Sequence, residues 1–260
     1  MNWRQMVPSA VTLMAMLAGF LSIIFTVQGI RADNDLPGQY YSWSAQLIML
    51  AMILDGLDGN LARWLHGRSD FGAELDTYVD LTAFGIAPAV LVFAVTLQNH
   101  DEFWRCLLPS AVALSGVVRL ARFKVRDPQR GQAGYSGLPI TANAAWVALF
   151  VFITLTPPRD QFSLNHGPVA VLFLTGIAVF IVLQVSNLRY PKPTKKAAMF
   201  IPCVVLVALL WLLQQRLAAK VAFVMILLGS GYVLFGPLFV KGMAVHRARK
   251  EARANGNGKA

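Results

Sequence analysis

The stretch Asp55–Asp80, DGLDGNLARWLHGRSDFGAELDTYVD, decides how the rest of this chain is read. Four of its five aspartates, at positions 55, 58, 76 and 80, fall in otherwise apolar surroundings, and long apolar segments stand on both sides of the stretch. Carboxylates at membrane depth are costly, so an ionisable residue inside a membrane segment indicates a functional site. We interpret the rest of the chain as a frame that holds these carboxylates near a membrane surface.

The composition predicts a membrane protein. The 260 residues are 56% hydrophobic and only 14% charged, with a mean hydropathy of +0.54. A soluble domain carries about 25% charged residues. The apolar residues fall in blocks that approach the roughly 20 residues needed to cross a bilayer. We therefore expect an all-α fold, a polytopic membrane bundle of about eight transmembrane helices.

The hydropathy pattern places these eight segments at about 8–30, 43–63, 71–97, 106–123, 138–155, 169–187, 199–213 and 221–240. We expect a single transmembrane catalytic domain over residues 1–240, with a core at 8–196 and two extra helices at 199–240. A basic tail follows over residues 241–260, and we expect it to fray.

The charge distribution predicts the orientation. The net charge is +10, and 18 of the 23 lysines and arginines fall on the side that would hold both termini and the aspartate stretch. The basic residues lie mostly in loops, so the positive-inside rule explains them better than a nucleic-acid partner, which we do not expect. The prediction is a multi-pass protein of the inner cell membrane, with both termini and the active site facing the cytoplasm.

The spacing of the aspartates brings them together. Two sets of residues share a helix face, at i, i+3, i+7 and at i, i+4, i+8: Asp55, Asp58 and Ala62 in the first, and Gly72, Asp76 and Asp80 in the second. The short loop between them makes the two helices antiparallel neighbours. Four converging carboxylates repel one another unless hard cations such as Mg²⁺, Mn²⁺ or Ca²⁺ bind them. Two such metals suit phosphoryl chemistry.

Small residues beside the carboxylates leave room for a ligand. Gly59, Ala62 and Gly72 would let a flat or bulky group approach the backbone, and Arg63 offers a bidentate fork for a phosphate.

The spacing D-x2-D-G-x2-A-R-x8-G-x3-D-x3-D, from Asp55 to Asp80, resembles at every position the signature of the CDP-alcohol phosphatidyltransferases. The resemblance implies that a CDP-linked lipid binds with its pyrophosphate on two divalent cations, Mg²⁺ or Mn²⁺, that an alcohol attacks the lipid-side phosphorus, and that CMP leaves. It implies that all four aspartates bind metal and that Asp80 is also the catalytic base. It implies substrate contacts by Gly59, Ala62, Arg63 and Gly72, and by Ser69, which stands where the family often has a hydroxyl residue.

Three further stretches are similar to the CDP-diacylglycerol–serine O-phosphatidyltransferases, the membrane phosphatidylserine synthases: RLARF at 119–123, YSGLPI at 135–140 and VSNLRYP at 185–191. This resemblance, from about Pro8 to Lys196, implies CDP-diacylglycerol and L-serine as substrates and phosphatidylserine and CMP as products. The sequence departs from the family's pattern at Lys124, where an asparagine is common. The resemblance also implies a homodimer among membrane lipids.

Three arginines in these stretches are candidate binding residues. Arg119 and Arg122 suit the lipid phosphate or the serine carboxylate, although they could equally be a helix end that satisfies the helix dipole. Arg189 begins a basic run that either only sets topology or holds an anionic lipid headgroup.

Two alternatives stay open from the sequence. The same chemistry with glycerol 3-phosphate would need a basic pocket for a second phosphate, which Arg119, Arg122 and Lys124 could form. A divalent-cation transporter would place acids or broken helices near the midplane of related halves, whereas these aspartates lie in two adjacent helices near one face.

Overall fold

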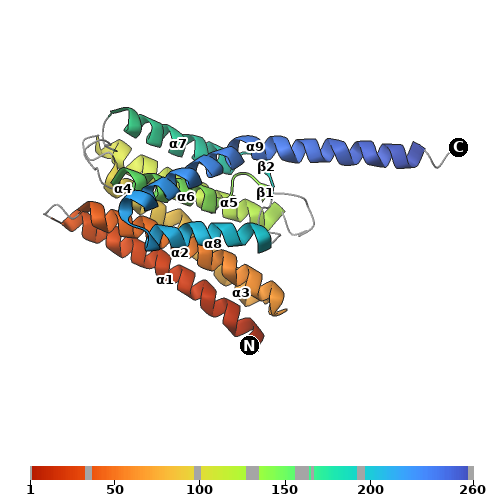
Figure 1. Ribbon diagram of the computed structural model, residues 1–260, viewed down its shortest axis with the longest axis horizontal. Helices are drawn as coiled ribbons and strands as arrows, with labels where there is room; N and C mark the ends of the chain where they lie inside the picture. Colours follow the sequence, from red (N-terminus) through yellow and green to blue (C-terminus); the bar gives the residue numbers. More distant parts are fainter. Residues whose placement is uncertain are drawn as a thin grey trace.

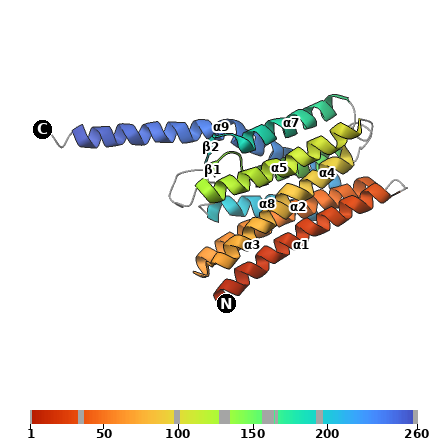
Figure 2. The ribbon, with the colours of Figure 1, turned by 180° about the vertical axis from the view of Figure 1, so that it is seen from behind.

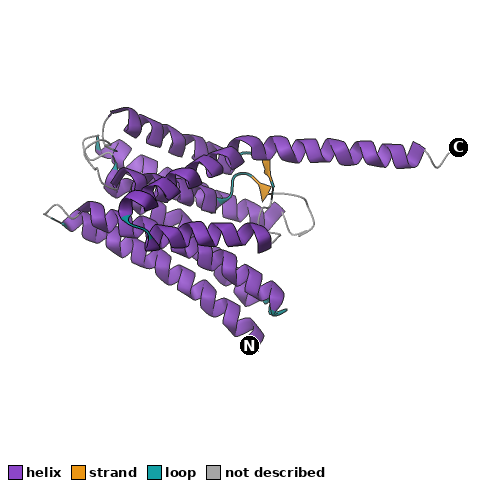
Figure 3. Ribbon diagram, in the orientation of Figure 1, coloured by secondary structure: helices purple, strands orange, loops and turns teal. Residues whose placement is uncertain are grey.

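The computed structural model describes residues 2–32, 37–96, 101–126, 135–155, 164, 167–191 and 197–256. Within these residues the protein is a bundle of helical rods with one short antiparallel ribbon (Figures 1 and 3). The predicted all-α membrane bundle is therefore confirmed. Its elements are α1 (Trp3–Arg31), α2 (Pro37–Trp64), α3 (Asp70–Asp80), η1 (Leu81–Ile86), α4 (Ala87–Val95), α5 (Glu102–Arg126), β1 (Tyr135–Ser136), α6 (Ile140–Leu155), α7 (Gly167–Val185), β2 (Arg189–Tyr190), α8 (Ala197–Leu212) and α9 (Gln215–Gly256).

Among the residues that the structure describes, six helices are long and apolar enough to cross a membrane: Trp3–Arg31, Gly38–Trp64, Asp70–Val95, Glu102–Val125, Gly167–Val185 and Gln215–Gly242. Two of the eight predicted segments correspond to shorter apolar helices, Ile140–Leu155 and Ile201–Leu212. Successive rods run in opposite directions, so the N-terminus, the α2–α3 connection, the ribbon and the C-terminus share one end of the bundle (Figure 1). We call it the site end.

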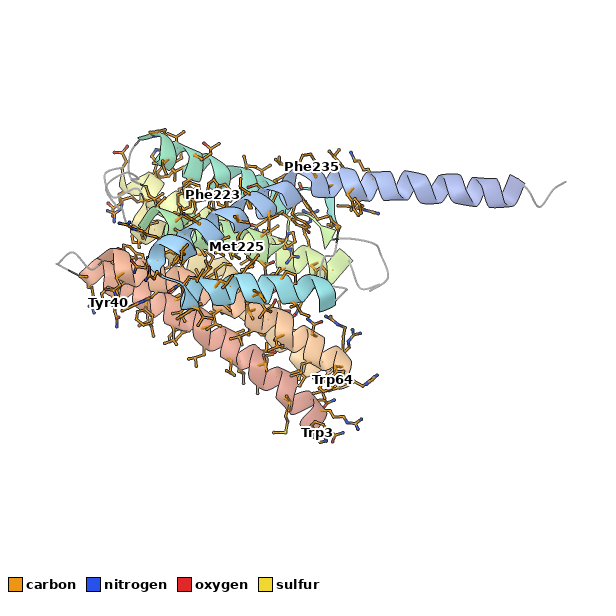
Figure 4. All side chains as sticks on the ribbon, in the orientation of Figure 1. Trp3, Tyr40, Trp64, Phe223, Met225 and Phe235 are labelled. Atoms are coloured by element: carbon orange, nitrogen blue, oxygen red, sulfur yellow. The ribbon has the colours of Figure 1, made fainter. Side chains whose placement is uncertain are left out.

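Aromatic side chains mark both ends of the first two helices. Trp3 and Trp64 lie at the site end, and Tyr40 lies at the opposite end (Figure 4). Tyr40 packs with Phe25 and Trp43, with ring centroids 6.3 and 5.7 Å from its own. Tryptophan and tyrosine favour the two membrane–water interfaces, so this spacing fits helices that span the bilayer.

The third rod changes its winding just after the last aspartate. Residues 70–95 form one rod, in which η1, a six-residue π-helix, begins directly after Asp80. At Ala83 this π-helix lies against Gly19 of α1, where a Cβ added to the glycine would come within 2.6 Å of the Ala83 Cβ. π-Helical turns are rare and occur frequently at functional sites. Because Gly19 has no Cβ, α1 can approach the rod closely at this point.

Hydroxyl groups join α1 to α2 inside the bundle. The Ser44 hydroxyl is 2.8 Å from that of Ser22 and 2.7 Å from that of Thr26, and all three residues are fully buried. Such satisfied polar contacts hold two membrane helices together where the hydrophobic effect between helices is absent. They fix the helix pair whose site end carries Asp55 and Asp58.

The C-terminal region differs from the prediction. The frayed tail expected over residues 241–260 is wrong for most of its length, because α9 continues without a break from Gln215 to Gly256. The predicted domain boundary at 240/241 thus falls inside one helix. An α-helix of 42 residues is roughly 63 Å long, and Figure 1 shows it projecting beyond the bundle. Two basic loops are predicted at 124–135 and 189–196, after the segments 106–123 and 169–187. Most of each loop lies outside the described residues.

Candidate active site

Three carboxylates gather where α2 and α3 meet at the site end. Asp55, Asp58 and Asp76 each offer one oxygen, and these oxygens lie within 4.8 Å of one another. Asp58 is only 5% exposed, and its Oδ2 atom has no hydrogen-bond partner. A buried carboxylate oxygen without a donor is costly. Hard divalent cations prefer oxygen ligands, so these residues fit a cation.

Asp80 lies one helical turn farther into the bundle than Asp76 and faces a second helix. It interacts electrostatically with the other three aspartates and also with Arg119 of α5. Arg119 itself is 7% exposed, and its guanidinium carbon lies 5.7 Å from the centre of the Phe123 ring. Asp80 therefore joins the carboxylate cluster on one side to a buried cation on the other.

A cavity of about 500 Å³ opens beside the cluster. Seven predicted site residues line it: Asp58, Gly59, Ala62, Arg63, Ser69, Gly72 and Asp76. The predicted residues Asp55, Asp80, Arg119, Arg122 and Arg189 are absent from this lining. The motif residues between the second and third aspartates thus form one wall of a cavity, and the three distal arginines belong to a different part of the site end.

The two motif glycines differ in what they allow. A Cβ at position 59 would meet only the Arg63 guanidinium, at 3.9 Å, so packing within the protein does not require glycine there. A Cβ at position 72 would come within 3.1 Å of the Ser69 hydroxyl oxygen. Gly59 therefore leaves space in the cavity itself, whereas Gly72 lets the start of α3 close against Ser69.

Arg63 and Ser69 each have a local structural contact. The Arg63 Nη2 atom donates to Asn60 Oδ1 at 2.8 Å, and the arginine is otherwise exposed. Ser69 is the N-cap of α3, and its hydroxyl oxygen accepts from the Gly72 amide at 3.0 Å. A hydroxyl cap satisfies one of the free amides at a helix start. The Ser69 O–H donor still lines the cavity and can serve a ligand there.

The first helix supplies residues that the sequence analysis did not single out. Gln5, Ser9 and Thr12 of α1 line the cavity opposite the motif. The sequence signal for them is that these three polar residues recur at helical spacing at the start of an otherwise apolar helix. Gly67, also in the lining, holds the α2–α3 loop against α1, because a Cβ there would collide with the Arg4 carbonyl oxygen. The cavity therefore exists only once α1 has packed on that loop.

The two other predicted arginines lie apart from the carboxylates. Arg122 donates through Nη2 to Asn187 Oδ1 at 2.6 Å and through Nη1 to the carbonyl oxygens of Val185 and Ser186. It thus satisfies carbonyls at the C-terminal end of α7. Arg189 is exposed on β2.

Lys124, the position that departs from the resembling pattern, is also engaged. Its ammonium lies 2.6 Å from a carboxylate oxygen of Glu74 on α3. Both side chains are more than a third exposed, at 41% and 61%. Exposed pairs of this kind contribute roughly 0–1 kcal/mol, so the contact orients α5 and α3 more than it stabilises them.

Comparisons with known proteins agree with this arrangement. The family model of the CDP-alcohol phosphatidyltransferases matches residues 5–183. A Helicobacter pylori protein named CDP-diacylglycerol–serine O-phosphatidyltransferase is 29% identical over 191 residues, 74% of each chain. Proteins of the same name from Methanocaldococcus jannaschii and Saccharomyces cerevisiae are each 34% identical to this chain. The two matches cover 61% and 68% of this chain, respectively, and 68% of each relative.

Proposed function

Because the chain belongs to the CDP-alcohol phosphatidyltransferase family, we propose that it transfers the phosphatidyl group of CDP-diacylglycerol to L-serine, giving phosphatidylserine and CMP. The observation that carries the proposal is the convergence of Asp55, Asp58 and Asp76 beside a cavity lined by the remaining motif residues. The names of the relatives support serine as the acceptor.

We propose that Asp55, Asp58, Asp76 and Asp80 hold two divalent cations, Mg²⁺ or Mn²⁺. The orphaned Asp58 oxygen and the close approach of three carboxylates support this assignment. When bound, the cations supply charge that polarises phosphoryl oxygens and steadies the departing phosphate. Without them, the buried like charges would repel one another.

The cavity side binds the donor nucleotide lipid in this proposal. Arg63 offers its guanidinium fork to a phosphate, and the Ser69 hydroxyl can donate to a phosphate or sugar oxygen. Gly59 and Ala62 leave the backbone accessible, so that a ligand ring can lie against α2. The α1 residues Ser9 and Thr12 line the same cavity and add hydroxyl groups to it.

The acceptor approaches Asp80 from the side of α5. Asp80 accepts the proton of the serine hydroxyl as the serine oxygen bonds to the phosphorus of the phosphatidyl group. The bond between that phosphorus and the bridging oxygen breaks, and CMP departs with the electron pair. Arg119 can pair with the serine carboxylate because its buried cation lies beside Asp80. A charge-assisted pair in such a setting is strong and directional.

The other arginines have supporting parts in the proposal. Arg122 holds the end of α7 beside the acceptor side, since its fork already bonds the 185–187 segment. Arg189 would meet an anionic lipid headgroup at the membrane surface, a role that its exposure on β2 supports.

Glycerol 3-phosphate fits less well as the acceptor. It would need a basic pocket for its own phosphate, for which the sequence offers Arg119, Arg122 and Lys124. Arg122 is bonded to the end of α7, and Lys124 is paired with Glu74. Arg122 and Lys124 would have to give up these contacts to bind a second phosphate. This favours serine as the acceptor, because its smaller carboxylate needs only one arginine.

We propose that the site end faces the cytoplasm of the inner cell membrane and that the protein is a homodimer. Both chain termini share that end with the α2–α3 connection (Figure 1), and most lysines and arginines of the sequence fall on the same side. The dimer rests on the family resemblance. Size measurement in detergent, by light scattering that corrects for bound detergent, tests it directly.

A paired acceptor assay tests the reaction. The purified protein is supplied with CDP-diacylglycerol, Mn²⁺ or Mg²⁺, and either serine or glycerol 3-phosphate, and CMP release is followed. The proposal predicts release that depends on both the metal and serine. Release without serine, or release stimulated only by glycerol 3-phosphate, would overturn the assignment of the acceptor.

A further inference from the structure

The segment 184–191, which holds the last two residues of α7 and the residues after them, is bonded to α5 at positions before and after Arg119. The Ser115 hydroxyl donates to Gln184 Oε1 at 2.6 Å, and the Arg122 guanidinium donates to Asn187 Oδ1 at 2.6 Å. Positions 115, 119 and 122 are spaced i, i+4, i+7, so they share one face of α5. The 184–191 segment therefore fixes the face of α5 that carries Arg119.

The same segment is fixed on its other side by the ribbon. β2 pairs with β1 in an antiparallel register that sets Ser136 opposite Arg189. The pairing continues in the Gly137 amide, which donates to the Leu188 carbonyl at 2.8 Å, and in the Leu138 amide, which donates to the Leu183 carbonyl at 3.0 Å. Gly137 has a φ of +79°, which favours glycine.

Helix α9 covers the outside of this ribbon. The Tyr232 hydroxyl donates to the Pro191 carbonyl at 2.8 Å, and its ring centre lies 5.8 Å from that of Tyr190, which is fully buried. One turn along, a Cβ added to Gly236 would come within 3.2 Å of both Pro191 Cδ and Tyr190 Cδ1. Figure 1 shows α9 passing beside β2. Gly236 thus allows the helix to lie against the segment.

The part of α9 that makes these contacts lies outside residues 5–183, where the family model matches. Its neighbouring turns carry exposed apolar side chains, such as Phe223 and Phe235 (Figure 4), which are 54% and 66% exposed. Such an exposed apolar face suits contact with lipid, whereas the opposite side of α9 packs on α6, α8 and β2. The Tyr232 hydrogen bond and the closest glycine contact of α9, at Gly236, both fall on the 184–191 segment.

We propose that α9 is a brace that sets the position of Arg119, and hence the affinity for the acceptor, through the 184–191 segment. Tyr232 and Gly236 are positioning residues in this arrangement, and neither touches the reacting atoms. The inference rests on the proposed function, because it assigns the acceptor carboxylate to Arg119. The donor cavity, lined by α1, α2, the start of α3 and Phe123, has no part in the brace.

The test compares two leucine substitutions on the same helix. Gly236→Leu pushes α9 away from Pro191, whereas Gly229→Leu adds the same side chain where nothing lies within 4 Å. Forcing extra carbons into a packed contact typically shifts the backbone. We expect Gly236→Leu to raise the KM for serine at least about fivefold, with kcat and the KM for CDP-diacylglycerol within about twofold of the parent, and Gly229→Leu to leave all three unchanged.

A milder change keeps the test decisive if Gly236→Leu fails to fold in detergent. Tyr232→Phe removes only the hydrogen bond to Pro191, and we expect a rise of about two- to fivefold in the KM for serine. Hydrogen exchange gives a readout that needs no substrate: the Gly137 and Leu138 amides should exchange faster in both brace variants than in Gly229→Leu.

The outcomes separate the two proposals. A parent protein that does not use serine would defeat the proposed function, whatever the exchange data show. A parent that uses serine, with an unchanged KM for serine in both brace variants, would defeat the brace alone. Equal rises in the KM of both substrates would also defeat it, since they would indicate a general structural loss.

Discussion

The carboxylate side and the arginine side of the site end differ in how the charged side chains Asp58 and Arg122 are bonded. The carboxylates come from α2 and α3, and their cavity is lined mainly by α1–α3 with Phe123 of α5; here Asp58 keeps an oxygen without any donor. On the side of α5 and α7, the basic residue Arg122 is already bonded to the protein itself. In both views α1 and α7 lie on opposite sides of the bundle (Figures 1 and 2).

The contrast teaches where ligands are expected to act. A side chain whose bonding capacity is unmet is ready for an incoming cation or phosphate, whereas one already satisfied mainly holds a helix in place. Asp80 and Arg119 stand between the two sides. Substitutions should therefore separate three effects: loss of the reaction at Asp80, loss of acceptor affinity at Arg119, and loss of donor affinity in the cavity.

The largest effect is expected for Asp80→Asn. The amide keeps the size of the side chain but cannot accept the serine proton, and loss of a positioned base typically costs about 10²–10⁴-fold in kcat. CMP release from CDP-diacylglycerol, measured at saturating serine, checks this value. Retained size and helix content in detergent would show that the variant is folded, and a normal kcat in it would remove the assignment of the base.

Arg119→Lys should have the next largest effect, and it should act on one substrate. Lysine keeps the charge but loses the planar fork that a carboxylate binds in a bidentate manner. We expect the KM for serine to rise by roughly tenfold or more, as the loss of a charged hydrogen bond implies. The KM for CDP-diacylglycerol is the internal control, and an effect on that KM alone would place Arg119 on the donor side.

Gly59→Leu should give the smallest of the three effects, on the other substrate. The leucine would occupy cavity space that meets no protein atom closer than Arg63, so the folded protein should tolerate it. We expect the KM for CDP-diacylglycerol to rise about tenfold, with little change in the KM for serine. Gly229→Leu, on the open face of α9, is the matched control. A rise in the serine KM would contradict the division into two sides.

The carboxylate side could be predicted from the sequence because its residues are close in the chain. Asp55 to Asp80 lie on two helices joined by a short loop, so helical spacing alone brings them together. Segment lengths likewise indicated the bundle, since each transmembrane helix is a local pattern, and the spacing of the Asp55–Asp80 motif indicated the family.

The arginine side could not be predicted in the same way. The contact of Arg122 with Asn187 spans 65 positions, and nothing local in the sequence tells whether such an arginine meets a substrate or a helix end. Ser9 and Thr12 were missed because their role depends on α1 packing beside the motif. The frayed tail was wrong because a polar, basic composition does not by itself end a helix that has already begun in the membrane.

Cation binding, measured without turnover, tests the central claim most directly. Mn²⁺ binding to the detergent-solubilised protein can be followed by the loss of the free-ion paramagnetic resonance signal, in the parent and in Asp58→Asn and Asp76→Asn. The account predicts saturable binding in the parent and at least about tenfold weaker binding in each variant, with Gly229→Leu unchanged. Equal Mn²⁺ binding in all four proteins, or none in the parent, would contradict it.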